Sequence, residues 1–207
     1  MRLVMLIIGT VAFAYLLGGL NGAIITARLF YRKDIRRYGS GNPGLTNFYR
    51  VFGKGGAALV VAIDVIKTVA PVLLGGWLFG KYYDMTFLGR AVTGFFVMLG
   101  HCFPVFYKFK GGKGVMAAGA IVIVLDWRMA IISWGTFLLL TALTRYVSLG
   151  AMVGGATFPF LVAVFELGGV WEVCVMTMCS ILLIARHAPN IGRLVRHEES
   201  KFSIRRE

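Results

Sequence analysis

A short turn rich in glycine and lysine, Phe109-Lys110-Gly111-Gly112-Lys113-Gly114, separates two apolar runs of the chain. Glycine lets the backbone come close to a ligand, so neighbouring N–H groups converge on an anion while lysines supply positive charge. We therefore predict that this turn binds a phosphate group. It is not a Walker loop, because Gly114 stands where Ser or Thr must follow the lysine. The alternative interpretation is a turn at a membrane surface whose lysines extend towards water.

A second polar loop, residues 31–56, carries six basic residues and a single acid. Its centre, Ser40-Gly41-Asn42-Pro43-Gly44, favours a tight turn and precedes Thr46 and Asn47, whose side chains offer hydrogen bonds. If a helix begins at Thr46 or Asn47, Arg50 projects from its first turn, where the helix dipole attracts anions. We expect a second phosphate-binding site here, with a purely structural turn as the alternative.

The composition is that of a membrane protein. Of the 207 residues, 58% are hydrophobic and only 15% are charged, an apolar share above that of ordinary soluble domains. In a soluble chain the formal net charge of +13 would indicate a nucleic-acid partner. Here the basic residues occupy short loops between apolar runs, so we expect no nucleic acid. The three cysteines lack the spacing of a metal site, and we expect no metal and no cofactor.

Seven apolar runs are candidates for membrane-crossing helices. They cover residues 1–29, 57–80, 87–106, 115–125, 130–143, 149–165 and 170–184. The first run is too long for a cleaved signal peptide, while the fourth and fifth are short for a crossing. We predict an all-α integral membrane protein with seven transmembrane helices, several of them short, in a single domain over residues 1–207.

Two charged residues, Asp64 and Lys67, lie within the second apolar run. Their i, i+3 spacing places them on one face of a helix, and charges at membrane depth are expensive unless they are paired. We interpret them mainly as a structural ion pair, with a contact to substrate as the alternative.

Most of the 22 lysines and arginines fall in four segments that the predicted topology places on one side: residues 31–56, 107–114, 144–148 and 185–207. The positive-inside rule makes this face cytoplasmic, with the N-terminus outside and the C-terminus in the cytoplasm. The candidate ligands on it are Ser40, Gly41, Asn42, Thr46, Asn47, Arg50, Lys108, Lys110, Gly111, Gly112, Lys113, Gly114, Ser148, Arg186, His187 and Asn190. Positive charge beside hydrocarbon suits a substrate with phosphate at one end and an acyl chain at the other.

General bases are scarce in these segments. The acyltransferase pattern His-x4-Asp is absent at all three histidines, and no acid-rich motif for a divalent metal is present. Such a site suits a substrate that is already activated by a good leaving group, so that positioning and charge stabilisation lower the barrier.

Three motifs in this order resemble those of the bacterial acyl-phosphate-dependent glycerol-3-phosphate acyltransferases, the PlsY family. They are Ser40-Gly41-Asn42-Pro43-Gly44 with Thr46, Asn47 and Arg50, then Gly100-His101 followed by Phe103-Pro104-Val105-Phe106 and Lys108 to Gly114, then Arg186-His187 with Asn190-Ile191 and Arg193-Leu194. The resemblance covers nearly the whole chain. It implies a seven-helix, multi-pass protein of the bacterial inner membrane whose active site faces the cytoplasm.

The resemblance further implies transfer of a fatty acyl group from acyl phosphate to the 1-hydroxyl of glycerol 3-phosphate. The products are lysophosphatidic acid and phosphate, in the first step of bacterial phospholipid synthesis. The implied partners are these two substrates and the lipid bilayer. The sequence leaves the oligomeric state open, with a monomer as one possibility.

The family's site residues carry over by position. Phosphate ligands would be Ser40, Thr46, Arg50, Lys110 and Ser148, and the turn from Gly111 to Gly114 would cradle acyl phosphate. His187 and Asn190 would orient glycerol 3-phosphate, and with Ser40 and Arg50 they are the catalytic candidates. Glu199 matches a tail glutamate to which we assign a structural role.

A few positions depart from the family's usual residues. Leu45 stands in place of Ala, Thr68 in place of Gly, His197-Glu198 in place of Gly-Thr, and Val115-Met116-Ala117-Ala118 in place of Val-Ala-Thr. None of these changes removes a phosphate ligand. They bear on the shape of the acyl pocket and on the packing of the tail.

Two routes remain open for the proton of the attacking hydroxyl. In one, the phosphate oxygens of acyl phosphate accept it and His187 only positions the substrate. In the other, His187 is the general base. The rival class of function is a binding or transport protein for phosphorylated ligands. Transport would require a polar path across the membrane, and the predicted helices offer little beyond Asp64 and Lys67.

Overall fold

The computed structural model describes residues 2–202, and within them every regular element is a helix. The elements are α1 (Arg2–Gly18), α2 (Gly22–Tyr31), η1 (Ile35–Arg37), α3 (Leu45–Phe52), α4 (Lys54–Tyr83), α5 (Thr86–Cys102), η2 (Val105–Tyr107), α6 (Val115–Leu125), α7 (Trp127–Thr144), α8 (Val147–Ala156), α9 (Phe158–Val164), α10 (Val170–Arg186) and α11 (Ala188–Val195). The all-α prediction is confirmed for this part of the chain.

Four helical segments within residues 2–202 are long and apolar enough to cross a membrane: α4, α5 with η2, α7, and α8 with α9. Two bent pairs, α1 with α2 and α10 with α11, each pass the same test together, which gives up to six crossings. The 11-residue helix α6 is about 16 Å long. That is half the thickness of a hydrocarbon core of roughly 30 Å. Six crossings are accounted for without α6, so the predicted seventh crossing requires this short helix to span the membrane.

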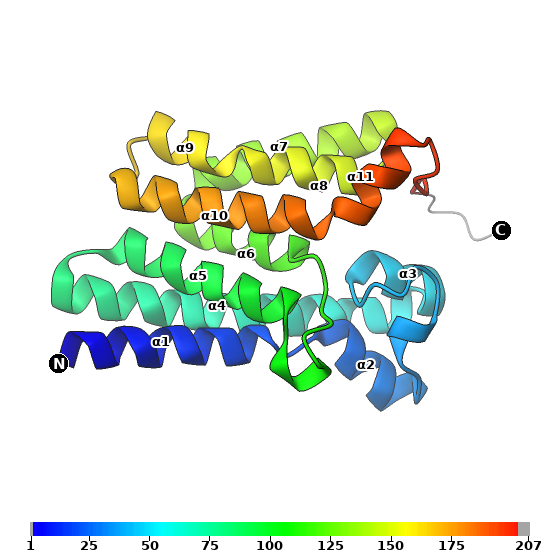
Figure 1. The fold of residues 1–207 in the computed structure, drawn as a ribbon, viewed down its shortest axis with the longest axis horizontal. Helices are drawn as coiled ribbons and strands as arrows, with labels where there is room; N and C mark the ends of the chain where they lie inside the picture. Colours follow the sequence, from blue (N-terminus) through cyan, green and yellow to red (C-terminus); the bar gives the residue numbers. More distant parts are fainter. Residues whose placement is uncertain (1, 203–207) are drawn as a thin grey trace.

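The helices form two groups with α6 between them (Figure 1). In the first group α5 packs against α1 and α4, and in the second α10 contacts α8 and α9. The buried side chains of α5, among them Val97 and Met98, belong to one apolar core that continues into α6 and α10. The start of α1 and the short helix α11 lie at opposite ends of the long axis of the molecule (Figure 1).

The first apolar run is not the single helix that its pattern predicts, but two helices that meet at 42°. Asn21 begins α2 as its N-cap, because its side-chain oxygen accepts a hydrogen bond from a backbone N–H in the first turn. At the break, backbone groups lose their hydrogen-bond partners within the helices, and the buried ion pair supplies new partners. Lys67 Nζ donates to the Leu20 carbonyl (2.5 Å), and Asp64 Oδ1 accepts from the Gly22 N–H (3.2 Å). The two charged groups are 2.8 Å apart, so the predicted ion pair is confirmed.

Residues 185–195, predicted as the start of a charged tail, are helical apart from the bend at His187. α10 continues to Arg186, and α11 follows at a bend of 56°. Pro189 lies in the first turn of α11. Its missing N–H removes a hydrogen bond that would otherwise continue α10, so the chain turns at His187.

Two of the predicted loops are shorter than expected. The region 31–56 contains η1 and α3, and α4 already begins at Lys54. The predicted loop 144–148 is reduced to Arg145 and Tyr146, because α7 and α8 extend into it from both sides. The sequence predicts these loops too long because apolar content indicates a helix only where the helix is buried in protein or lipid. The polar ends of these helices lack that pattern.

Glycines allow α1 and α5 to approach closely. A methyl group on Gly18 would overlap the backbone of Val97, and one on Gly100 would overlap the carbonyl of Tyr15. By contrast, a methyl group on Gly9, also in α1, would meet no atom within 4 Å.

We expect Gly18→Ala to destabilise the folded protein and Gly9→Ala to leave its stability unchanged or raised. Overpacking against rigid backbone costs about 1–3 kcal/mol, whereas replacing an exposed helical glycine by alanine gains about 1 kcal/mol. Thermal unfolding of both variants in one detergent measures the difference. Equal midpoints for the two variants would show that α1 and α5 do not pack this closely.

Candidate active site

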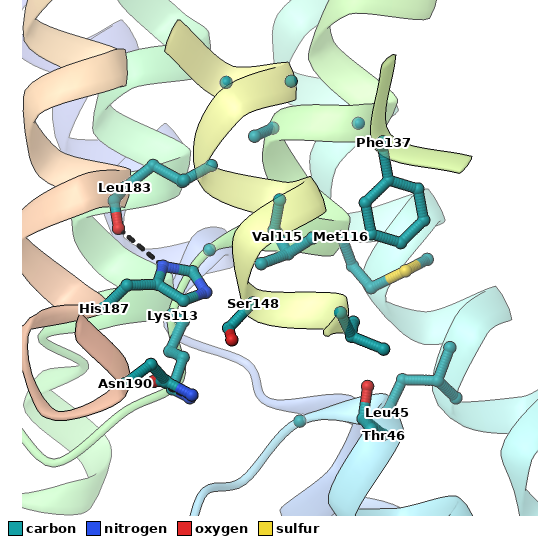
Figure 2. Close-up of a pocket in the computed structure, with 18 of the residues that line it drawn as sticks. Leu45, Thr46, Lys113, Val115, Met116, Phe137, Ser148, Leu183, His187 and Asn190 are labelled. Carbon is teal, nitrogen blue, oxygen red and sulfur yellow. Dashed lines mark hydrogen bonds between the residues drawn. The ribbon is translucent and has the colours of Figure 1, made fainter. Parts of the chain in front are cut away.

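A cavity of about 700 Å³ lies where α3, α6, α7, α8, α10 and α11 meet (Figure 2). Its polar part is lined by Ser40, Asn42, Thr46, Asn47, Arg50, Lys113, Ser148, His187, Asn190, Arg193 and Glu199. Its apolar part is lined by Val115, Met116, Val122, Trp134, Phe137, Ala151, Phe158 and Leu183. Figure 2 shows Lys113, Ser148, His187 and Asn190 close together, with Met116 and Phe137 farther along the cavity. One cavity therefore joins a basic polar end to an apolar groove.

Two asparagines hold the first motif in shape. Asn47 accepts a hydrogen bond from the Ser40 N–H (2.9 Å) and donates one to the Tyr38 carbonyl (3.0 Å). Asn21, at the break between α1 and α2, donates to the Pro43 carbonyl (3.0 Å). Asn47 borders the cavity, but both ends of its amide are used to fix the loop.

The position of Arg50 differs from the expected one. α3 begins at Leu45, after Gly44 as its N-cap, and Arg50 lies in the last turn rather than the first. The predicted effect of the helix dipole on an anion at Arg50 is therefore wrong, because a helix N-terminus attracts anions only within its first turn. Arg50 still borders the cavity, where its guanidinium can bind a phosphate through paired hydrogen bonds.

The glycine-rich turn is clamped from two sides. On one side the Gly112 N–H donates to the His101 carbonyl (3.1 Å). On the other side Arg186 donates to the carbonyls of Gly112 (3.2 Å) and Gly111 (3.3 Å), and its guanidinium lies 4.9 Å from the centre of the Phe103 ring. The N–H donors of Arg186 thus bind the backbone of the turn itself.

Lys113 carries the charge of this turn into the cavity, where its Nζ donates to Oδ1 of Asn190 (2.5 Å). Burial lowers the pKa of Lys113 to about 8. Glu199 opposes this effect, while Arg193 and Arg186 add to it. The ammonium is therefore charged at neutral pH but loses its proton well before an ordinary lysine would.

Glu199 connects several side chains at the polar end of the cavity. Its carboxylate accepts hydrogen bonds from Ser148 Oγ (2.6 Å), Asn190 Nδ2 (2.6 Å) and Arg193 Nε (2.7 Å). Burial raises the pKa of the Glu199 carboxyl, but these hydrogen bonds outweigh burial and hold the pKa below its usual value. An ionised Glu199 therefore joins α8, α11 and the following tail, which gives the expected structural role a physical basis.

His187 lies at the bend between α10 and α11 and is only 2% exposed. Its Nδ1 lies 2.8 Å from the Leu183 carbonyl oxygen. Because a carbonyl only accepts, Nδ1 carries the proton, and in the neutral ring the lone pair is on Nε2. Figure 2 shows this second nitrogen turned away from Leu183 towards the cavity. His187 is thus placed to accept a hydrogen bond from a substrate hydroxyl.

The predicted site residues divide into two sets. Those that border the cavity are Ser40, Asn42, Thr46, Asn47, Arg50, Lys113, Gly114, Ser148, His187 and Asn190. Those that do not are Gly41, Lys108, Lys110, Gly111, Gly112 and Arg186. Lys108 and Lys110 are exposed on the outer side of the turn. Lys113 borders the cavity and these two lysines do not, because the backbone changes direction at the turn and successive side chains there point to different sides.

The cavity also includes Asp64, His101, Arg193 and Glu199, which were not among the predicted ligands. For Glu199 a signal was available, since it is one of few acids in a strongly basic tail. For Asp64 and His101 the sequence offered a charge within an apolar run and a position in the second motif, but their place beside the cavity depends on how α4 and α5 pack.

Comparison with known proteins agrees with this geometry. The sequence profile of the family described as "Glycerol-3-phosphate acyltransferase" matches residues 8–197. A protein of that name from Erwinia tasmaniensis is 41% identical over 194 residues, which cover 94% of this chain and 91% of the relative.

Two crystal structures of PlsY, an integral membrane glycerol 3-phosphate acyltransferase, have a similar fold. The glycerol 3-phosphate form has a TM-score of 0.85 at 33% identity, covering 95% of this chain and 96% of the other. The lysophosphatidic acid form has a TM-score of 0.82 at 31% identity, covering 95% of each chain. With the profile match over most of its length, the chain belongs to the glycerol-3-phosphate acyltransferase family.

Proposed function

We propose that the protein transfers a fatty acyl group from acyl phosphate to the 1-hydroxyl of glycerol 3-phosphate, giving lysophosphatidic acid and phosphate. The observation that carries this proposal is the single cavity with a basic polar end and an apolar groove. Acyl phosphate has the same two parts, a phosphate group and a hydrocarbon chain. The PlsY structures in glycerol 3-phosphate and lysophosphatidic acid forms support the acceptor and the product.

The residues that border the cavity suggest a division of roles. The phosphate groups bind to Arg50 and Lys113 with the hydroxyls of Ser40, Thr46 and Ser148. The acyl chain lies in the apolar groove between α6, α7 and α8, along side chains such as Met116 and Phe137. Asn190 and His187 orient glycerol 3-phosphate so that its 1-hydroxyl faces the acyl carbon.

In the proposed reaction the 1-hydroxyl oxygen forms a bond to the acyl carbon, and the bond between that carbon and the phosphate oxygen breaks. The hydroxyl proton leaves on a phosphate oxygen. His187 accepts a hydrogen bond from the 2-hydroxyl through Nε2 and so orients glycerol 3-phosphate for the attack, which leaves the proton of the 1-hydroxyl to the phosphate oxygen. Lys113 stabilises charge on the departing phosphate.

We further propose that the fold crosses the bacterial inner membrane seven times as a monomer, with α6 as a short crossing. The N-terminus then lies outside, and the C-terminus and the cavity face the cytoplasm. The concentration of lysine and arginine at the end of the bundle that holds the cavity supports this orientation.

The first experiment is phosphate release by the purified protein from palmitoyl phosphate. Release should depend on glycerol 3-phosphate, and acyl-CoA should not replace the donor. In sealed vesicles, added glycerol 3-phosphate should support release only where the cytoplasmic face is turned outward. Release that ignores glycerol 3-phosphate, or silence from a folded sample, would contradict the proposed reaction.

His187→Gln separates positioning from general base catalysis. The glutamine amide oxygen still accepts a hydrogen bond but does not take a proton at neutral pH. The proposed positioning role therefore predicts substantial remaining turnover, with the same fall in kcat/KM above about pH 8 as in the wild type. A loss of about two orders of magnitude or more in kcat would instead identify His187 as the base. Initial rates between pH 6 and pH 9 provide the measurement.

The lowered pKa of Lys113 predicts the alkaline limb of the pH profile. As pH rises through about 8, the ammonium loses its charge, and kcat/KM for acyl phosphate should fall. Bound phosphate stabilises the charged form of Lys113, so kcat should change less with pH than KM does. Lys113→Arg keeps its charge, and although a lower rate is expected at neutral pH, its kcat/KM should stay flat to pH 10. A parallel decline in wild type and variant would rule out Lys113 as the titrating group.

A further inference from the structure

Trp134 lies beside the apolar groove, and two contacts fix its indole ring there. Its Nε1 donates to the Gly119 carbonyl (3.2 Å), a hydrogen bond that joins α7 to α6. Its ring also meets the edge of the Phe137 ring, with centroids 5.7 Å apart and ring planes at 89°. An edge-to-face arrangement of this kind is a favoured one, and the N–H has its partner. The indole is therefore held in one orientation.

Gly119 provides the space that the indole occupies. A methyl group on Gly119 would overlap the Trp134 ring, so the ring packs directly against the backbone of α6. Gly135, the neighbour of Trp134 on α7, shows the contrast, because a methyl group there would meet no atom within 4 Å. A glycine inside a helix costs about 1 kcal/mol relative to alanine. At position 119 this cost permits the close approach of the indole.

The position of the indole along the groove follows from the geometry of α6. Val115, Gly119 and Val122 border the cavity and share one face of this helix. Gly119 lies one turn beyond Val115, or about 6 Å along the helix axis. An extended chain of single bonds advances about 1.2 Å per bond, as extended backbone does. An acyl chain whose first carbon lies level with Val115 therefore passes the indole at about carbon 6.

The other walls near this depth are small and rigid. Ala118 on α6 is 2% exposed and Ala151 on α8 is 4% exposed, and both border the cavity. Alanine has no rotamer with which to make room for a wider ligand. The width of the groove at this depth is therefore set by the fixed ring of Trp134.

The bilayer determines what such a ring can do for selectivity. A donor dissolved in lipid already has its chain in apolar surroundings, because lipid tails are as apolar as leucine. Contacts inside the groove then add little affinity. Discrimination between chains must come mainly from rejection of shapes that do not fit. A fixed ring opposite small side chains provides such rejection.

We propose that Trp134, packed on Gly119, is a specificity-determining residue that admits straight acyl chains and rejects chains widened by a branch near carbon 6. The ring narrows the groove at one depth only, so a branch farther along the chain is accepted. This inference rests on the proposed function, because it places the chain of the acyl donor in the groove.

Three donors and three variants test this inference. The donors are palmitoyl phosphate and two methyl-branched forms of it, one branched on carbon 6 and one on the carbon next to the chain end. Trp134→Ala removes the ring, and Trp134→Leu is a milder change that keeps an apolar side chain. Trp127→Ala is the matched control, since Trp127 is also on α7 but is 68% exposed and does not border the cavity.

For the wild type, kcat/KM should be lower with the carbon-6 branch than with the straight chain by about tenfold or more, the usual effect of one misplaced carbon in an apolar pocket. The end-branched donor should match the straight one. Both Trp134 variants should lose the discrimination against the carbon-6 branch, and Trp127→Ala should keep it. Thermal-shift titrations with the corresponding unreactive phosphonates should show the same ratios in affinity without turnover.

The proposal is overturned if the wild type accepts all three donors equally, or if the folded Trp134 variants still reject the carbon-6 branch. It is also overturned if neither Trp134 variant folds, since the indole then serves the fold alone. Failure of the proposed function has a different signature, namely a folded wild type that binds the straight phosphonate but releases no phosphate with both substrates. In that case the affinities for the straight and branched phosphonates still decide the role of Trp134.

Discussion

The buried ion pair of Asp64 and Lys67 is the interaction on which the rest of this structure depends. Inside a bilayer every backbone polar group needs a partner within the protein, so a broken helix is tolerated only where side chains supply the missing bonds. Here the pair satisfies the Leu20 carbonyl and the Gly22 N–H at the break between α1 and α2. Loss of either charge alone would leave its partner buried and uncompensated, which is costly.

The break between α1 and α2 has a direct consequence for the site. It frees Asn21 both to cap α2 and to bond the Pro43 carbonyl, which anchors the first motif beside the cavity. A second interruption, at Pro189, has the same effect at the other end of the chain, where it brings Asn190 within reach of Lys113. The second interruption lines the polar cavity through His187 and Asn190, while the first is satisfied by the buried ion pair.

The charges at the cavity are balanced so that an anion is still attracted. Of the two acids that border it, Asp64 is neutralised by Lys67, and Glu199 is bound to Arg193. Arg50 and Lys113 therefore leave the cavity with a positive character. Glu199 also explains how a site rich in cations is held together before substrate binds, since one carboxylate joins Ser148 and Asn190 from two helices.

The sequence by itself determined the helical membrane character, the i, i+3 ion pair and the concentration of phosphate ligands in a few loops, because hydrophobic runs, charge spacing and glycine turns are local signals. The tertiary structure decided which of those ligands meet. Lys113 reaches the cavity while Lys108 and Lys110 stay outside. The side chains of Asn47 and Arg186 donate their hydrogen bonds to loop backbone. The start of α3 after Gly44 and the bend at His187 before Pro189 have local causes, but the hydrophobic pattern alone does not mark them. The link from Lys67 to His101 joins residues 34 positions apart, so only the packing of α4 against α5 could bring them together.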